Sequence, residues 1–248
     1  MITGSAQRGG ASVPVVNRRR SYVWWPLDFY STAVGKKAVM AVTGIILLGF
    51  VLLHMLGNLK LYQGAEHMNA YGEWLRTVGS PAVPNKGTLW AVRVILIVAF
   101  ALHIHAAASL TLMNRRARPV GYQGPRKYTA ADYAARTMRW SGVIVGLFVL
   151  FHLSDLTWGW ANPDFQGGHP YENTVASLSR WWTAAIYIVA NLLLGMHIYH
   201  GAWSLFQSLG LTLGRFKSWR RGFAIAFAAL IVAGNVSFPI AILTGAVS

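Results

Sequence analysis

Five long apolar segments, separated by polar connectors, dominate the pattern of hydrophobic and polar positions along the chain. They run roughly over residues 38–61, 89–113, 140–160, 182–209 and 222–246 and are rich in Ala, Val, Ile, Leu and Phe. A helix needs about 20 mostly apolar residues to cross the hydrocarbon layer, where backbone polar groups must be bonded within the helix itself. The pattern therefore predicts an all-α integral membrane bundle of five transmembrane helices.

The connectors between these segments collect turn residues and charges, as in GSPAVPNKG before the second segment and NPDFQGGHPYEN before the fourth. Trp and Tyr lie near several segment ends, where aromatic rings favour the headgroup layer. The expected organisation is a basic arm with an interfacial segment over residues 1–37, followed by a five-helix membrane domain over residues 38–248.

Composition sharpens this picture. The 248 residues carry a net charge of +15, yet 54% are hydrophobic and only 12% are charged. In a soluble nucleic-acid-binding protein, the basic residues that give such a charge would lie among polar residues. Nucleic acid is therefore not an expected partner. The chain has no cysteine. Disulfides, cysteine metal sites and thiolate nucleophiles are therefore excluded within it.

The basic residues indicate an orientation. Residues 1–37, 115–139 and 215–221 together hold 17 of the 22 Lys and Arg residues. These segments are alternate connectors and must share one face of the membrane. By the positive-inside rule that face is cytoplasmic, so we expect the N-terminus inside and the C-terminus outside. The same face is where anionic headgroups are expected to bind.

Six of the eight histidines lie inside the predicted spans, where an ionisable group is costly and marks a functional hypothesis. The other two, His67 and His169, are in outer connectors and are expected to be solvated. The first span contains one intramembrane histidine, the second two, the third one and the fourth two: His54, His103, His105, His152, His197 and His200.

Depth sorts four of these histidines into two pairs. His54 and His152 lie near the outer ends of their spans, whereas His103 and His197 lie deeper toward the cytoplasm. Two opposed imidazoles at one level are suited to bis-histidine ligation of haem b, which needs no cysteine. For a single membrane histidine, the ordinary alternative is an interhelical hydrogen bond. This alternative explains less well why four different helices each carry a histidine inside the membrane.

A wide, flat porphyrin also needs small residues beside its ligands. Such residues occur near all four histidines, although small residues are common wherever membrane helices pack closely. They are Gly57, Ala106, Ala107, Gly146, Gly195 and Gly201.

Four histidine-containing blocks carry a family resemblance. TGIILLGFVLLHMLGNLKLY, LHIHAAASLTLMNRRARPVGY, RTMRWSGVIVGLFVLFHLSDLTWG and HIYHGAWSLFQSLGL, in this order, resemble the single-chain, five-helix cytochrome b anchor of succinate:quinone oxidoreductases, the succinate dehydrogenase and fumarate reductase family. The resemblance covers nearly the whole chain from Ser31 onward.

The resemblance implies a membrane subunit of complex II that relays electrons from partner iron–sulfur clusters to membrane quinone, in a bacterial plasma membrane. Succinate or fumarate chemistry would lie on partner chains, a flavoprotein with FAD and an iron–sulfur protein, both on the cytoplasmic face. A higher oligomer of the complex is also possible. One or two haems b are implied, His54 with His152 holding the outer one and His103 with His197 the inner one.

Several alternatives remain open on the residues alone. His105 competes with His103, and His200 lies one turn beyond His197, so six histidines exceed the needs of two haems. A two-histidine [2Fe-2S] cluster would need cysteines from a partner chain. The wider alternatives are a cytochrome b anchor of another quinone-linked oxidoreductase, and a cofactor-free or proton-relaying scaffold.

The quinone site has two candidate positions. An inner site would use Trp24, Tyr30 and Ser31, although the arginine that two-chain relatives place near such a serine is replaced here by Lys36 and Lys37. An outer site would use Asp155, a carboxylate one turn beyond His152 that could exchange protons.

Overall fold

The computed structural model describes residues 24–117, 130–210 and 217–248, with side chains from Thr137 in the third long helix and from Trp219 in the last. Within these residues the secondary structure is entirely helical. The basic positions expected in the first 23 residues, and those at Arg118, Arg126, Lys127 and Arg215, lie outside the described residues. The elements are α1 (Trp25–Ser31), α2 (Ala33–Asn58), η1 (Leu59–Gln63), α3 (Ala65–Thr77), α4 (Gly87–Arg116), α5 (Ala130–Leu156), α6 (Pro170–Leu178), α7 (Trp181–Ser208) and α8 (Lys217–Leu243).

The long helices α2 (continued by η1), α4, α5, α7 and α8 are apolar and long enough to cross a membrane. They coincide with the five predicted segments, and the chain is an integral membrane protein. Several bounds differ by a few residues. The first long helix begins earlier, at Ala33. The third ends at Leu156, because Trp158 and Trp160 belong to the connector, and the fifth runs from Lys217 to Leu243.

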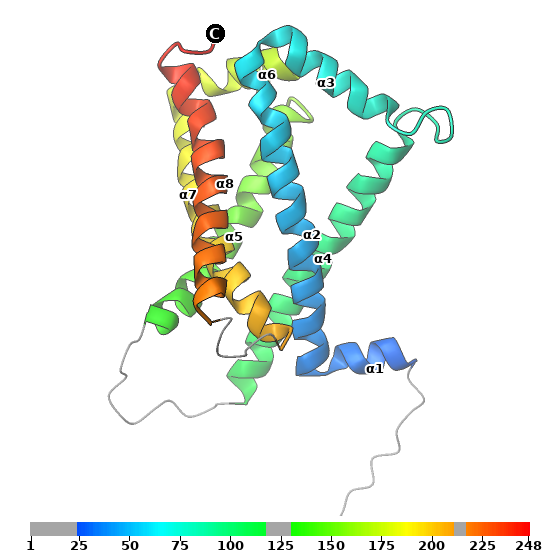
Figure 1. Ribbon diagram of the computed structural model, residues 1–248, viewed down its shortest axis with the longest axis vertical. Helices are drawn as coiled ribbons and strands as arrows, with labels where there is room; N and C mark the ends of the chain where they lie inside the picture. The colour runs from blue at the N-terminus through cyan, green and yellow to red at the C-terminus, as the bar shows by residue number, and fades with distance from the viewer. Residues whose placement is uncertain (1–23, 118–129, 211–216) are drawn as a thin grey trace, which may run out of the picture.

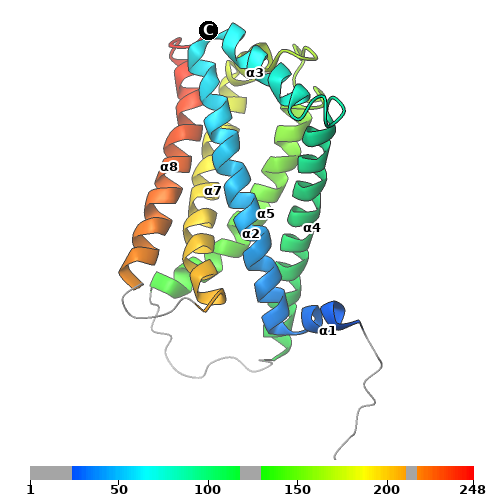
Figure 2. The same ribbon diagram turned by 45° about the vertical axis from the view of Figure 1, so that its right-hand side comes forward.

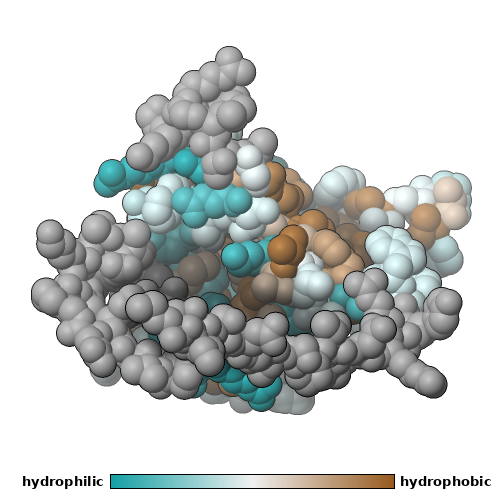
Figure 3. Space-filling view, turned by 90° about the horizontal axis from the view of Figure 1, so that it is seen from below, coloured by the Kyte–Doolittle hydropathy of each residue, from teal (hydrophilic) through white to brown (hydrophobic). Residues whose placement is uncertain are grey.

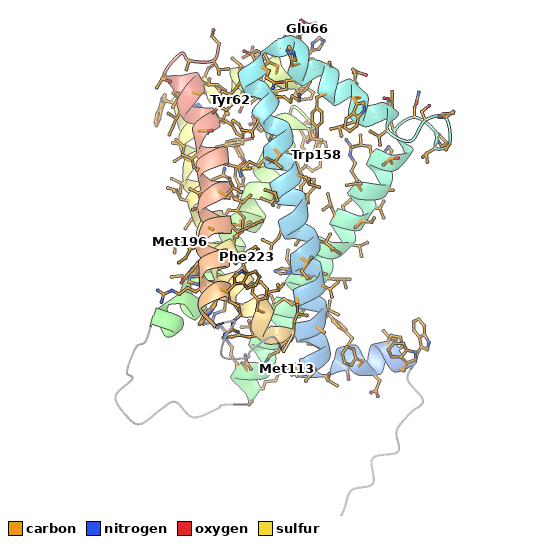
Figure 4. The ribbon with its side chains drawn as sticks, viewed as in Figure 1. Tyr62, Glu66, Met113, Trp158, Met196 and Phe223 are labelled. Atoms are coloured by element: carbon orange, nitrogen blue, oxygen red, sulfur yellow. The ribbon has the colours of Figure 1, made fainter. Side chains whose placement is uncertain are left out.

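The five helices form one bundle in which α8 packs along α7, α2 along α4, and α5 along α7. Short helices mark its two ends (Figures 1 and 2). α1 projects sideways at one end, here called the α1 end. η1, α3, α6 and the C-terminus lie at the other, here called the capped end. Figure 4 labels Tyr62 and Glu66 at the capped end, and Met113 and Phe223 toward the α1 end.

Many large apolar side chains point outward, as lipid-facing residues do; Ile97 is 65% exposed and Leu53 66%. The buried side chains form two clusters along the bundle. One lies near the capped end and includes Leu61, Met68, Leu178, Tyr187, Phe238 and Ile242. The other joins α2, α7 and α8 and includes Met55, Ile198, Ala228 and Ile231.

The capped end contains two helices that the sequence pattern leaves as connectors. α3 and α6 are too short and too polar to span a membrane, and a search for spanning lengths therefore passes over them. Asn69 of α3 joins them, because its amide nitrogen donates to the Glu172 carboxylate at 3.0 Å and its amide oxygen accepts from the Tyr171 N–H. The Asn69 hydrogen bond lowers the pKa of Glu172 from its ordinary value.

Close packing of α7 on α8 depends on Gly195. A Cβ atom there would overlap the side chain of Val232, whose rotamer is restricted in a helix. Gly201, two turns further along α7, has open space at the same position.

We therefore expect Gly195→Ala to destabilise the bundle by about 1–3 kcal/mol, the usual cost of overpacking. The thermal midpoint of the purified protein in detergent measures this change. Gly201→Ala is the matched control, since it gains the same helix propensity without the overlap. An equal or higher midpoint for Gly195→Ala would contradict the close approach.

Candidate functional site: two histidine pairs inside the bundle

The first histidine pair joins α2 to α5 in the half of the bundle nearer the capped end. The rings of His54 and His152 have centroids 5.8 Å apart and planes at 85° to each other. Phe50 stacks on His54 at 5.3 Å, and Phe148 lies 5.9 Å from His152. Two imidazoles from different helices therefore face one another between aromatic side chains.

The second pair joins α4 to α7 nearer the α1 end. The ring centroids of His103 and His197 are 6.4 Å apart, with planes at 63°. Gly44 of α2 lies close to the edge of the His103 ring, and Gly142 of α5 lies close to the His197 ring. The structure thus brings together the same two pairs that depth along the helices indicated. Ligation by these histidines stays a prediction.

The two pairs lie at different depths, and two helices give the same spacing between them. Thr43, beside His103, precedes His54 on α2 by eleven residues, and Ser141, beside His197, precedes His152 on α5 by eleven. Eleven residues correspond to about 16 Å of helix and three full turns, so both positions share one face of each helix. The pairs are therefore stacked along the bundle.

Hydroxyl groups hold both histidines of the second pair. Thr43 Oγ1 donates its proton to the Val39 carbonyl at 2.7 Å and lies 3.1 Å from His103 Nδ1. With that hydroxyl proton on the Val39 carbonyl, the arrangement favours the tautomer in which His103 Nδ1 is the donor. The same holds for His197, whose Nδ1 is 3.4 Å from a Ser141 hydroxyl that donates to Met138. The neutral ring then keeps a free lone pair on Nε2.

His152 of the first pair is held in the same way by a longer chain. Its Nδ1 lies 3.2 Å from Tyr187 Oη, and that phenol donates to Asp155 Oδ2 at 2.9 Å. His152 is therefore the donor to the tyrosine and also keeps its Nε2 lone pair. Thr43, Ser141 and Tyr187 are not among the residues predicted from the sequence. The first two have a recognisable signal, because each is a hydroxyl residue eleven positions before a histidine, His54 on α2 or His152 on α5.

Asp155 itself is fully buried. Besides Tyr187, it accepts a hydrogen bond from Ser177 at 2.5 Å and pairs with Arg180 at 3.2 Å, and Arg180 also donates to the Ala161 carbonyl. Asp155 is therefore not exposed to water, although it lies at the end of α5. Its oxygens are occupied by three partners, and its role is to tie α5 to α6, α7 and the connector before α6.

Glycines around the pairs divide into two groups. Gly49 and Gly146 have no heavy atom within 4 Å of a Cβ built on them, so neither glycine packs against a neighbouring helix. Gly57 and Gly195, expected beside a porphyrin, instead pack against Tyr71 and Val232. Their small size serves helix packing.

His105 does not join the second pair. Its Nδ1 is 2.5 Å from Tyr30 Oη, and the two rings stack with centroids 5.7 Å apart. The ammonium of Lys36 lies 4.8 Å from the centre of the Tyr30 ring and donates to the Tyr30 carbonyl. A tyrosine from α1, a histidine from α4 and a lysine from α2 therefore meet at the α1 end of the bundle.

The remaining candidates lie apart from the pairs. Ser31 is exposed and donates to the Asp28 carbonyl, and Trp24, just before α1, is 71% exposed. His200 has a buried Nδ1 atom that has no hydrogen-bond partner among the described residues. His67 lies on α3, and His169 precedes α6 with Nδ1 3.8 Å from Glu172.

Across the described parts of the chain, no group of three or more His, Asp or Glu side chains is placed to hold a metal ion. Each histidine pair offers two ligands. A metal bound there would need its further ligands from another molecule, which fits a cofactor that brings its own donor atoms, such as the four nitrogens of a porphyrin.

Fold and site together define a helical membrane protein with histidine pairs stacked inside a five-helix bundle. Residues 126–236, a little under half of the chain, match the family of the succinate dehydrogenase/fumarate reductase transmembrane subunit. The match includes one histidine of each pair, His152 and His197. Comparison with curated proteins and with solved structures finds no match for the chain.

We expect Asp155→Ala to destabilise the protein by about 3–5 kcal/mol, because Arg180 would lose its carboxylate partner in a mostly buried position. The thermal midpoint in detergent is the measurement. Asp164→Ala, which removes an exposed carboxylate at the same end, is the control and should leave the midpoint nearly unchanged. Equal midpoints for the two variants would show that the network contributes little.

Proposed function

We propose that this protein is the membrane anchor and electron-transfer subunit of a succinate:quinone oxidoreductase, with b-type haem held by His54 with His152 and by His103 with His197. The observation that carries the proposal is the presence of two facing imidazole pairs at two depths of one bundle. The family match supports the type of complex.

The ring separations agree with ligation of one metal by each pair. A metal–imidazole bond is about 2.0–2.1 Å long and a ring centre lies about 1 Å behind its nitrogen, so opposed ligands have centroids about 6 Å apart. The separations of 5.8 Å and 6.4 Å lie on either side of this distance. Ligation does not restrict the angle between the two ring planes, because each plane contains the metal–nitrogen axis whatever that angle is.

The surrounding side chains favour the same chemistry. Thr43, Ser141 and Tyr187 accept from Nδ1 and leave Nε2 free, which is how proteins orient metal-binding imidazoles. Haem b supplies a one-electron carrier when bound. The chain's contribution is to fix two ligand pairs at two depths and to shield them with aromatic and aliphatic side chains.

Partner subunits are proposed to dock at the α1 end. Basic side chains are exposed there on α2, α4, α5 and α8, against Asp28 as the one acidic side chain described at this end. Figure 3 views this end and shows hydrophilic side chains between apolar ones. The positive-inside rule makes it the cytoplasmic face. The family match supports a flavoprotein and an iron–sulfur subunit as partners.

We further infer that quinone is reduced near Tyr30 and His105. Reduction of a quinone to a quinol takes up two protons as well as two electrons. The phenol of Tyr30 and the imidazole of His105 are hydrogen-bonded to each other, and His105 is exposed, so this pair can deliver a proton and be recharged. Asp155, the outer candidate, is less suitable because its oxygens are already occupied and it has no exposed surface.

A reduced-minus-oxidised absorbance spectrum of the purified complex tests the haem assignment. We expect b-type α bands from two haems in the wild type, loss of one component in His152→Ala, and loss of the other in His103→Ala. His67→Ala, at the capped end, is the control and should keep both haem components. Succinate oxidation with a soluble acceptor should survive in all variants, since that chemistry lies on other chains.

A spectrum without b bands would overturn haem binding while leaving the anchor role intact. Iron and acid-labile sulfide counts, set against the cysteines of the partner chains, would then test for a two-histidine [2Fe-2S] cluster.

Substitution of Tyr30 tests the quinone site. We expect Tyr30→Phe to lower quinone-reductase kcat by about 10²-fold or more, the usual contribution of a positioned proton donor. Haem content and succinate oxidation with a soluble acceptor should stay unchanged. Tyr62→Phe removes a phenol that bonds Ser237 at the capped end and is the matched control. Wild-type kcat in Tyr30→Phe would move the reaction elsewhere.

A further inference from the structure

His152 is linked to a buried carboxylate through a single tyrosine. The Nδ1–H of His152 donates to Tyr187 Oη over 3.2 Å, and that hydroxyl donates to Asp155 Oδ2 over 2.9 Å. Asp155 is fully buried and Tyr187 is 7% exposed, so water does not compete for either hydrogen bond. The histidine and the carboxylate lie three residues apart on α5, and the tyrosine of α7 bridges them.

The hydrogen bonds of the second histidine pair end differently. Its hydroxyl partners, Thr43 and Ser141, each donate to a backbone carbonyl of their own helix, which is a neutral acceptor. Tyr187 instead donates to a carboxylate that pairs with Arg180 at 3.2 Å. A hydrogen bond to an ionised acceptor is about twice as strong as one between neutral groups. The polarised oxygen of Tyr187 is therefore a stronger acceptor for an imidazole N–H than either of the other two hydroxyls.

A second donor competes for the same carboxylate oxygen. Ser177 of α6 donates to Asp155 Oδ2 at 2.5 Å, and this oxygen also accepts from Tyr187. Each donor withdraws electron density from the shared oxygen, so the serine weakens its pull on the tyrosine proton. The short helix α6 therefore influences how strongly Tyr187 is polarised, and hence how strongly Tyr187 accepts from His152.

We propose that Tyr187 is a positioning residue that lowers the reduction potential of the haem held by His54 and His152, with Asp155 and Ser177 setting the size of the effect. This inference rests on the proposed function. A strong acceptor at Nδ1 raises the basicity of a ligating imidazole, and a more basic ligand favours the more positive, oxidised metal. This haem is thereby made harder to reduce than it would be with a neutral hydrogen-bond partner.

Redox titration of the purified complex tests this role in Tyr187→Phe. Because His152 loses its acceptor, its imidazole becomes a weaker electron donor. We expect the potential of one b haem, the component absent from His152→Ala, to rise so that its reduced-to-oxidised ratio at fixed potential increases about tenfold, equivalent to about 59 mV. The component absent from His103→Ala should keep its potential. Tyr171→Phe, which removes a phenol bonded to the Ser248 carbonyl at the capped end, is the matched control.

Ser177→Ala separates this role from a merely structural one, because the expected shift has the opposite sign. Without the serine proton, Asp155 Oδ2 accepts more strongly from Tyr187, and the potential of the same haem should fall by a smaller factor. In the double variant with Tyr187→Phe, the serine substitution should have no further effect, since the tyrosine that transmits it is absent. A general loosening of the capped end would instead move both single variants in the same direction and would overturn the proposal.

The remaining outcomes are equally decisive. Equal potentials in Tyr187→Phe and the wild type, or a Ser177→Ala shift that persists in full in the double variant, would overturn this role of Tyr187. If Tyr187→Phe does not assemble, Ser177→Ala decides alone, because a lowered potential supports the proposal and an unchanged one overturns it. A wild-type complex without b haem would overturn the proposed function together with this inference. Unshifted potentials in a complex that contains haem would overturn this inference alone.

Discussion

Polar side chains inside a hydrocarbon-facing bundle must find their partners within the protein, and the arrangement of the intramembrane histidines depends on this constraint. Water is not available to satisfy an imidazole in the middle of a span. In this bundle His103, His152 and His197 each donate from Nδ1 to a hydroxyl whose own proton is used elsewhere. The ring orientation and the tautomer therefore follow from interhelical hydrogen bonds.

The same constraint links the first pair to the architecture of the capped end. Tyr187 connects His152 to Asp155, and Asp155 is held by Ser177 and Arg180 on the segment that follows α5. The short helix α6 therefore has a structural role beyond covering the bundle. A shift of Asp155 at the capped end would reach His152 through two hydrogen bonds, from Asp155 to Tyr187 and from Tyr187 to His152.

The α1 end is built differently. Cationic side chains lie there, in place of the hydrogen-bond network that surrounds Asp155 at the capped end. Lys36 donates to backbone carbonyls beside Tyr30, while the buried Arg220 has no described partner. The hydrogen-bond and ion-pair network around Asp155 at the capped end and the cations of the α1 end accord with a division of labour. The capped end stabilises the bundle, and the α1 end is where quinone and partner subunits are proposed to bind.

The apolar periodicity by itself determined the five spans, because the length of a membrane helix is fixed by the hydrocarbon thickness. It also indicated the histidine pairs, since depth follows from residue number at a constant rise per residue. It did not determine α3 and α6, whose polar, short sequences lack that length signal. Only the tertiary structure decided that Asp155 is buried, that His105 bonds Tyr30, and that Arg220 faces inward. These facts depend on which helix faces turn toward one another, and that is set by packing between residues far apart in the chain.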